Sequence, residues 1–210
     1  MISSESGFSI SSSRAQRVDY TFSRQYEMMQ TLPAMFDTPL VFLDLETTGA
    51  SADRDRITEI GLIEVAGAHV VQEWSTLVDP GRVIPPAVVS LTGITDHMVA
   101  QAPTFADISA ELLERLEGRL LVAHNARFDY AFLRAEFRRL GIRYRSRALC
   151  TVRLSRALFP EHRHHNLDSV IERFALSCRA RHRALGDAQA VWAFARELER
   201  SVDQIGRAHV

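Results

Sequence analysis

The feature that most constrains the fold is a series of short apolar runs separated by polar residues and turn signals. Residues 40–43 (Leu-Val-Phe-Leu) and 120–123 (Leu-Leu-Val-Ala) suit buried β-strands and are far shorter than the ~20 residues of a membrane span. Residues 57–65 and 69–78 are rich in β-forming side chains and flank the turn signal Ala-Gly-Ala, which predicts an antiparallel hairpin. A further short strand is expected near Ala148.

Apolar residues recur at helical spacing in the segments between and after these strands. Thr104 is the expected N-cap of an amphipathic helix. Further helices are predicted over residues 126–140, 151–158, 166–174 and 187–200. A strand hairpin followed by alternating helices and strands predicts an α/β fold, with a mixed sheet flanked by helices.

The 210 residues have the size of one domain with short flanking segments. Seven of the first 13 residues are serine, so we expect a partly disordered extension over 1–38, with residues 20–36 forming a helix or packed arm. The domain proper is expected over 39–203, followed by a short tail over 204–210. The sequence shows no secretory signal or disulfide framework, which favours a cytoplasmic protein with no membrane partner.

Two carboxylates follow the first apolar run, in the order Leu43-Asp44-Leu45-Glu46. Because side chains alternate along a strand, Asp44 and Glu46 should point to the same face. Two like charges on one face repel each other unless a cation lies between them. A solvated strand end is the alternative interpretation, since Asp-x-Glu also occurs by chance.

Three further polar residues join this pair. Asp129 follows the second apolar run, Asp187 lies near the start of the last predicted helix, and His182 lies on the loop before Gly186. Each taken alone has an ordinary alternative, either a carboxylate in a helix's first turn or an exposed loop histidine. Together, four oxygen donors suit Mg²⁺ or Mn²⁺, in the manner of two-metal sites for phosphoryl displacement, and a histidine can accept a proton near neutral pH.

Three segments carry a resemblance to a known family: Asp44-Leu45-Glu46-Thr47-Thr48-Gly49, His124-Asn125-x-x-Phe128-Asp129 and His182-x-Ala184-x-x-Asp187. They resemble the three exonuclease motifs of the DEDDh family, most of all the proofreading epsilon subunits of bacterial DNA polymerase III, and the match extends over residues 39–200. The resemblance implies a ribonuclease-H-like mixed sheet of five strands. It also implies a 3′–5′ exonuclease that releases 5′-mononucleotides from single-stranded or frayed DNA ends.

The resemblance implies further roles for individual residues. Two Mg²⁺ (or Mn²⁺) ions would be held by four ligands, and a histidine would be the general base. The terminal ribose would meet the backbone of two strand residues, the terminal bases would pack on three apolar side chains, and two polar residues would orient the strand end. The four ligands would be Asp44, Glu46, Asp129 and Asp187, and the general base would be His182. Leu45 and Thr47 would meet the terminal ribose, and Leu91, Ile94 and Phe128 would pack on the terminal bases. His124 and Asn125 would orient the strand end. For Phe128, a core aromatic is the alternative.

All 25 basic residues are arginine, and the formal net charge of −1 excludes a broadly basic protein. Residues 134–163 nevertheless contain nine Arg and two Glu, a local balance of +7. Such a run would neutralise the phosphates of a nucleic-acid strand next to an acidic pocket. A solvated helix face in an arginine-rich sequence is the alternative.

The sequence alone leaves several partners and several classes of function open. Polymerase-bound epsilon subunits carry a C-terminal segment, whereas only residues 201–210 follow the last predicted helix. A partnership with the alpha subunit of DNA polymerase III therefore stands beside an exonuclease that acts alone, in DNA repair or in RNA trimming. A decayed nucleic-acid-binding module would show losses among the five residues named for catalysis, and none is lost. A small-molecule phosphodiesterase would use the same metal ligands.

Overall fold

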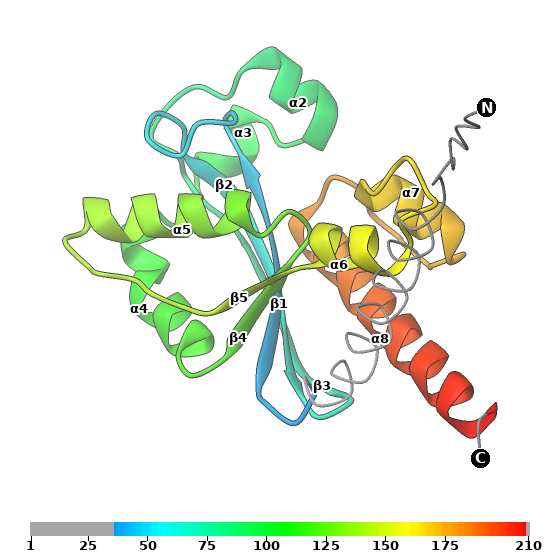
Figure 1. The fold of residues 1–210 in the computed structure, drawn as a ribbon. Coiled ribbons are helices and arrows are strands. Elements are labelled where there is room, and N and C mark those ends of the chain that lie inside the picture. Colours follow the sequence, from blue (N-terminus) through cyan, green and yellow to red (C-terminus); the bar gives the residue numbers. More distant parts are fainter. Residues whose placement is uncertain (1–35, 209–210) are drawn as a thin grey trace, which may run out of the picture.

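A computed structural model describes residues 36–208, with side chains described over 36–201. A mixed sheet of five strands in the order β3-β2-β1-β4-β5 forms its centre, so the predicted fold class is confirmed (Figure 1). The central strand β1 is antiparallel to β2 and parallel to β4, and β3 and β5 form the two edges. The strands are β1 (Leu40–Thr47), β2 (Ile57–Ala66), β3 (His69–Leu77), β4 (Leu120–Ala123) and β5 (Ala148–Cys150).

Seven described helices complete the domain. They are α2 (Pro86–Thr92), α3 (Asp96–Val99), α4 (Phe105–Leu116), α5 (Arg127–Arg139), α6 (Thr151–Leu158), α7 (Leu167–Arg173) and α8 (Ala184–Ala208). Thr104 caps α4 as predicted, because its hydroxyl accepts the backbone N–H of Asp107 while the Asp107 carboxylate accepts the backbone N–H of Thr104. Among these helices, none is both long and apolar enough to cross a bilayer.

The two ends of the chain differ from the expectations or lie beyond them. The last helix begins three residues earlier than predicted and continues to Ala208, so most of the predicted tail over 204–210 is helical. The predicted extension and arm lie outside the described residues except at their C-terminal end. There, Phe36 is buried and packs edge-on against Trp192 of α8, with ring centroids 6.0 Å apart.

The sheet has a separate core on each face, and the alternation of β1 assigns its residues to one or the other. Val41 and Leu43 belong to the core beneath α4 and α5, whereas Leu40 and Phe42 belong to the core beneath α8. Figure 1 shows α4 and α5 on one side of the sheet and α8 on the other. The same alternation carries the next even-numbered residues of β1 toward α8.

Two glycines allow close backbone contacts at the start of α8. Gly61 of β2 is paired with Asp44, and a Cβ atom at Gly61 would lie 2.1 Å from the backbone nitrogen of Leu185. Gly186, which precedes the last predicted helix in the sequence, lies inside the first turn of α8. A Cβ atom there would lie 2.1 Å from the carbonyl oxygen of Ala180. Gly61 therefore lets the start of α8 lie against β2, and Gly186 lets the preceding loop at Ala180 lie against the first turn of α8.

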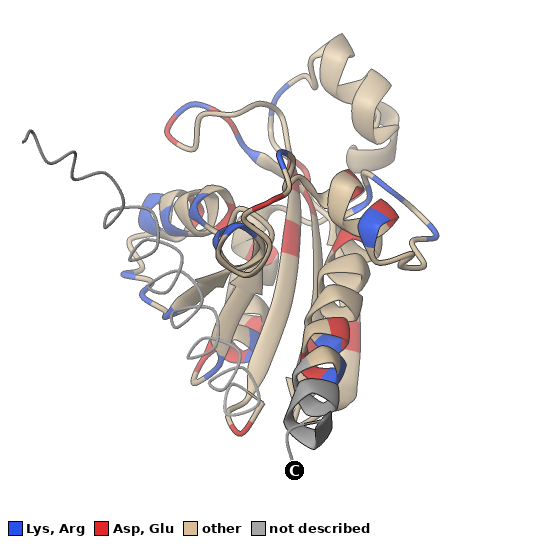
Figure 2. Ribbon diagram, turned by 45° about the vertical axis from the view of Figure 1, so that its right-hand side comes forward, with Lys and Arg blue, Asp and Glu red and all other residues tan. Residues whose placement is uncertain are grey.

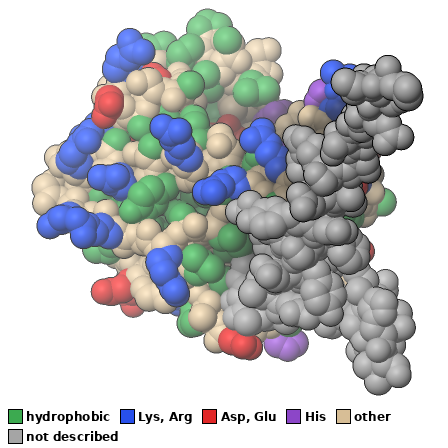
Figure 3. Space-filling view, in the orientation of Figure 1, with side chains coloured by type: hydrophobic (Ala, Val, Ile, Leu, Met, Phe, Trp, Pro, Cys, Tyr) green, Lys and Arg blue, Asp and Glu red, His purple; other side chains and the backbone are tan. Residues whose placement is uncertain are grey.

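Charge is unevenly distributed over the fold. Figure 2 shows basic residues gathered on the side of α5, and Figure 3 shows arginine side chains spread across that face with few acidic ones among them. Because the chain has no lysine, every basic residue in these views is arginine.

Candidate active site

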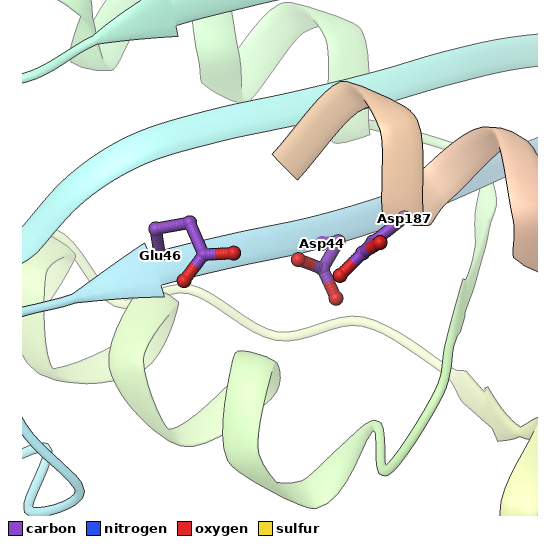
Figure 4. Close-up of side chains that lie close together, drawn as sticks. All are labelled: Asp44, Glu46 and Asp187. Carbon is purple, nitrogen blue, oxygen red and sulfur yellow. The ribbon is translucent and has the colours of Figure 1, made fainter. Parts of the chain in front are cut away.

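Three carboxylates converge where β1 passes the start of α8. One oxygen from each of Asp44, Glu46 and Asp187 lies within 4.8 Å of the others, and we call these three residues the carboxylate cluster (Figure 4). Asp44 and Glu46 share a face because they are two residues apart on β1, and Asp187 lies in the first turn of α8. The structure thus brings together three of the four predicted metal ligands.

Asp129, the fourth predicted ligand, approaches from the opposite side of β1. It lies in the first turn of α5, its side chain is only 2% exposed, and the nearby backbone N–H groups of Asp129 and Leu45 lower the pKa that burial raises. Its charge raises the pKa of Asp44, so it belongs to the same electrostatic site as the cluster.

The electrostatics of the site favour the neutral forms of the acids. Burial raises the pKa of Asp44 well above its ordinary value, and the neighbouring carboxylates raise it further. Burial also raises the pKa of Asp129, and burial followed by the charge of Asp187 raises the pKa of Glu46 to about 7. A group of buried acids with raised pKa values is a site whose charge is insufficiently compensated by the protein itself.

Arg181 supplies part of the missing positive charge, and sequence reasoning did not give it this role. Its guanidinium pairs with Asp187 and, through Nε at 2.6 Å, with Asp168 of α7. Its charge lowers the pKa of both Asp44 and Glu46. No local sequence signal distinguishes this arginine from the others nearby, because its partners come from two different helices.

A second ion pair holds the turn before α8. Glu59 of β2 is only 5% exposed, is paired with Glu46 in the register of β1 and β2, and binds Arg183 through both carboxylate oxygens at 2.5–3.1 Å. It also accepts the backbone N–H of Ala184 at 3.0 Å. Glu59 lies within residues 39–200, over which the family resemblance extends, but its partner 124 positions away was not predictable from spacing.

His182 lies between these two paired arginines. It is half-buried and has a positive φ of 58°, which is uncommon for a residue other than glycine and recurs at functional sites. When protonated, its charge lowers the pKa of Asp187, so its ring lies near the carboxylate cluster. The neighbours of His182 on both sides are fixed by ion pairs, which positions the turn next to the cluster.

The residues predicted to contact the terminal bases differ in how far their side chains are exposed. Leu91 of α2 is 57% exposed and is available to a ligand. Ile94 is fully buried with Ile84 and Val99 in a small core, so its side chain is not exposed in this structure and its contact with a base stays a prediction. Phe128 is half-buried, packs against the core and lies 4.8 Å from the ring of Phe132, so the alternative of a core aromatic holds in part and its contact with a base stays a prediction.

The polar residues predicted to hold the strand end lie at the ends of β1 and β4. Both ring nitrogens of His124 are bonded within the protein, Nδ1 to the hydroxyl of Thr151 and Nε2 to the carbonyl oxygen of His165, each at 2.9 Å. Burial lowers the pKa of His124 to about 4, so the ring is neutral and builds the wall of the site. Asn125 is exposed at a positive φ of 71°. Thr47 donates its hydroxyl to the carbonyl oxygen of Gly49 at 2.7 Å.

The donor set fits a divalent cation. Oδ1 of Asp187 is buried and has no hydrogen-bond partner among the described residues, which is costly unless a cation binds there. Carboxylate oxygens without sulfur or imidazole ligands suit Mg²⁺ or Mn²⁺ better than zinc. The residues present are therefore those that hold such ions.

Comparison with known proteins identifies the family. The model of the exonuclease family RNase T matches residues 41–194, which include every acidic residue of the site. The chain belongs to this exonuclease family. The resemblance that the three motifs indicated is confirmed.

Individual relatives place the exonuclease domain in several contexts. The chain is 34% identical over 173 residues to the PolC-type DNA polymerase III of Caldanaerobacter subterraneus subsp. tengcongensis, covering 82% of this chain and 12% of that protein. It is 42% identical over 163 residues to a Mycobacterium tuberculosis protein provisionally named a bifunctional exonuclease/endonuclease, covering 73% of this chain and 25% of that one. The chain thus spans a quarter or less of these two relatives.

One solved structure has nearly the same extent as this exonuclease domain. Exonuclease X in complex with 5′-overhanging duplex DNA superposes with a TM-score of 0.65 and 27% identity, covering 77% of this chain and 92% of that one.

Proposed function

We propose that this protein is a metal-dependent 3′–5′ exonuclease that removes 5′-mononucleotides from single-stranded or frayed DNA 3′ ends. The observation that carries the proposal is the convergence of Asp44, Glu46 and Asp187 within 4.8 Å of one another, beside buried Asp129. Like charges gathered in this way are stabilised by cations, and two-metal sites of this kind serve phosphodiester hydrolysis.

Each residue has a distinct role in the proposal. Asp44, Glu46, Asp129 and Asp187 hold two divalent cations, which, when bound, activate water and stabilise the negative charge that develops on the phosphate. His182 takes the proton of the attacking water at a ring nitrogen, since an imidazole can act as a general base near neutral pH. Glu59 and Arg183 keep the His182 turn in place.

The strand end is held by the walls of the site. Leu91 and Phe128 offer apolar surface to the terminal bases, and the backbone around Leu45 and Thr47 faces the terminal ribose. DNA is favoured over RNA because the similar exonuclease X is in complex with duplex DNA, and the PolC-type relative is a DNA polymerase. The same relative supports a polymerase partner, the alpha subunit of DNA polymerase III.

The test uses strands of equal sequence, one DNA and one RNA, each labelled at the 5′ end. With Mg²⁺ or Mn²⁺ we expect the DNA strand to shorten one nucleotide at a time from the 3′ end, and EDTA to stop the reaction. Asp44→Asn is the matched control, because it removes a ligand and keeps the side chain's size.

The outcomes separate the alternatives. Full activity in EDTA would contradict the metal site. Faster cleavage of RNA would identify a trimming exoribonuclease with the same ligands. Cleavage of a dinucleotide but of no longer strand would favour a small-molecule phosphodiesterase.

A further inference from the structure

The segment between α5 and β5 presents arginines whose side chains pair with none of the described residues. From residue 142 to residue 147 the side chains alternate between inside and outside, and Arg143, Arg145 and Arg147 are all exposed. This alternation is that of an extended chain, which places the three arginines on one side at intervals of roughly 6.6 Å. We call residues 142–147 the arginine segment.

The arginine segment is anchored to the core by the residues between the arginines. Tyr144 is 7% exposed and packs against Phe137 and Tyr130, with ring centroids 5.1 and 5.8 Å away. The backbone N–H of Leu121 in β4 donates to the carbonyl oxygen of Arg147 at 3.1 Å. The backbone that carries the arginines is therefore fixed in the folded protein.

These arginines differ from others in the same domain. Arg115, Arg119 and Arg139 each pair with a buried glutamate and so have a structural role. Over residues 36–201, no ion pair and no hydrogen bond engages the guanidinium group of Arg143, Arg145 or Arg147. Their charges are thus available to a ligand.

Hollows flank the arginine segment on both sides. One of about 420 Å³ is lined by Arg119, Arg143, Arg145 and Arg147, among other residues. A second of about 420 Å³ is lined by Arg134, Arg138 and Arg143. The acidic residues that line them are Glu117 in the first and Asp53 in the second, and Asp53 is paired with Arg138. Figure 3 shows the arginine-rich face to which the segment belongs.

We propose that the arginine segment binds the sugar–phosphate backbone of the strand whose 3′ end is in the active site. This inference rests on the proposed function and names where the rest of the substrate lies. The segment leads through β5 to Thr151, whose hydroxyl contacts His124 in the wall of the site (Figure 1). Each phosphate carries one negative charge, and arginine binds phosphate through its planar guanidinium.

The spacing defines which phosphates are reached. Arg147 is four residues from Thr151, and Arg143 is eight, so an extended chain places them roughly 13 and 26 Å from the wall of the site. A stacked strand advances about 3.4 Å per nucleotide, so the segment reaches phosphates about four to eight nucleotides from the reacting end. Strands shorter than this gain nothing from the segment.

The test compares oligothymidylates of two, six and twenty nucleotides with Mg²⁺. For the variant Arg143→Gln/Arg145→Gln/Arg147→Gln we expect kcat/KM on the twenty-nucleotide strand to fall about tenfold at low salt, because three phosphate contacts are lost. Hydrolysis of the dinucleotide should stay within twofold of the wild type, which also shows that the variant is folded. The slope of log affinity against log salt for the long strand should decrease by about 2.

Two further variants serve as controls. The triple lysine variant retains the charge and should keep the length dependence. Arg196→Gln/Arg200→Gln on α8 removes two charges elsewhere and should also keep it. A triple lysine variant as weak as the triple glutamine variant would overturn the proposal.

Binding is measured separately by fluorescence anisotropy of a labelled twenty-nucleotide strand in EDTA, where no metal-dependent hydrolysis takes place. About tenfold weaker binding by the triple glutamine variant would support the proposal, whether or not the wild type cleaves the strands. If the wild type cleaves none of the three strands, that result contradicts the proposed function but not the binding of the strand by the arginine segment. Equal binding by the variant and the wild type would overturn the proposal and indicate an acidic protein surface as the ligand of this segment.

Discussion

The carboxylate cluster and the arginine segment are two concentrations of like charge that the fold treats in opposite ways. The cluster brings its charges together at the start of α8, where burial raises the pKa values of its members. The arginine segment spaces its charges along an exposed extended chain, where water solvates each one. Repulsion within the cluster therefore requires a bound cation, whereas the segment is stable without a ligand and uses its charge only when a polyanion arrives.

The largest effect on activity is expected from removing one carboxylate of the cluster. Asp44→Asn should reduce the rate of strand cleavage about 10⁴-fold, because a lost metal ligand removes several kcal/mol of transition-state stabilisation. The rate is measured in single turnover with a twenty-nucleotide strand and saturating Mg²⁺.

The same variant has an opposite effect on stability. In EDTA, Asp44→Asn should melt at a higher temperature than the wild type, since one of the repelling charges is gone. A variant that is both inactive and less stable would indicate that Asp44 has a mainly structural role.

His182→Ala tests the proton transfer next to the cluster without altering the cluster's charge. We expect the chemical step to slow by about 10²–10⁴-fold, the usual contribution of a positioned general base. Mg²⁺ affinity, followed by isothermal titration calorimetry, should change little because all four carboxylates remain. Wild-type turnover in this variant would assign the base to another residue.

The metal-free protein should lose stability as the pH rises. Because the pKa of Glu46 is about 7 in the folded protein and near 4.5 in the unfolded chain, the folded state binds more protons between these values. Stability then falls from about pH 4.5 to pH 7, by on the order of 3 kcal/mol from this group, or roughly 5–10 °C in Tm.

The pH effect is measured as Tm against pH in EDTA, with Glu46→Gln as the control that should remove the part of the slope due to Glu46 between about pH 4.5 and pH 7. Adding Mg²⁺ at pH 8 should raise Tm, because the ion binds only the folded state. A Tm that is independent of pH in EDTA would contradict the raised pKa of Glu46.

The smallest effect, on Mg²⁺ affinity, is expected from replacing Arg181. This variant tests an arginine that forms ion pairs with the site, in contrast to those of the arginine segment. Its guanidinium pairs with Asp187, so a cation that binds Asp187 must displace it or share the carboxylate with it. Arg181→Gln should therefore tighten Mg²⁺ binding by about three- to tenfold, corresponding to roughly 1 kcal/mol. Arg143→Gln, which removes an arginine that forms no ion pair within residues 36–201, is the matched control and should leave Mg²⁺ affinity unchanged.

The sequence by itself determined those features of this protein that depend on local patterns of residues. Strand alternation predicted that Asp44 and Glu46 share a face, and the helical pattern and its capping residue predicted α4 from Thr104 onward. The order of hairpin, helices and short strands predicted a mixed α/β sheet, and the three motifs indicated the exonuclease family. These properties are visible in sequence because each depends on residues two to five positions apart.

Only the tertiary structure decided which of these residues meet. Glu59 and Arg183 pair across 124 positions because Gly61 lets α8 lie against β2, and Arg181 reaches Asp187 while held by Asp168 of α7. Tertiary packing also buried Ile94, which sequence reasoning had assigned to the substrate. A charge, a hydrogen bond or an apolar contact acts through distance in space, and that distance is fixed only when the sheet and α8 have packed together.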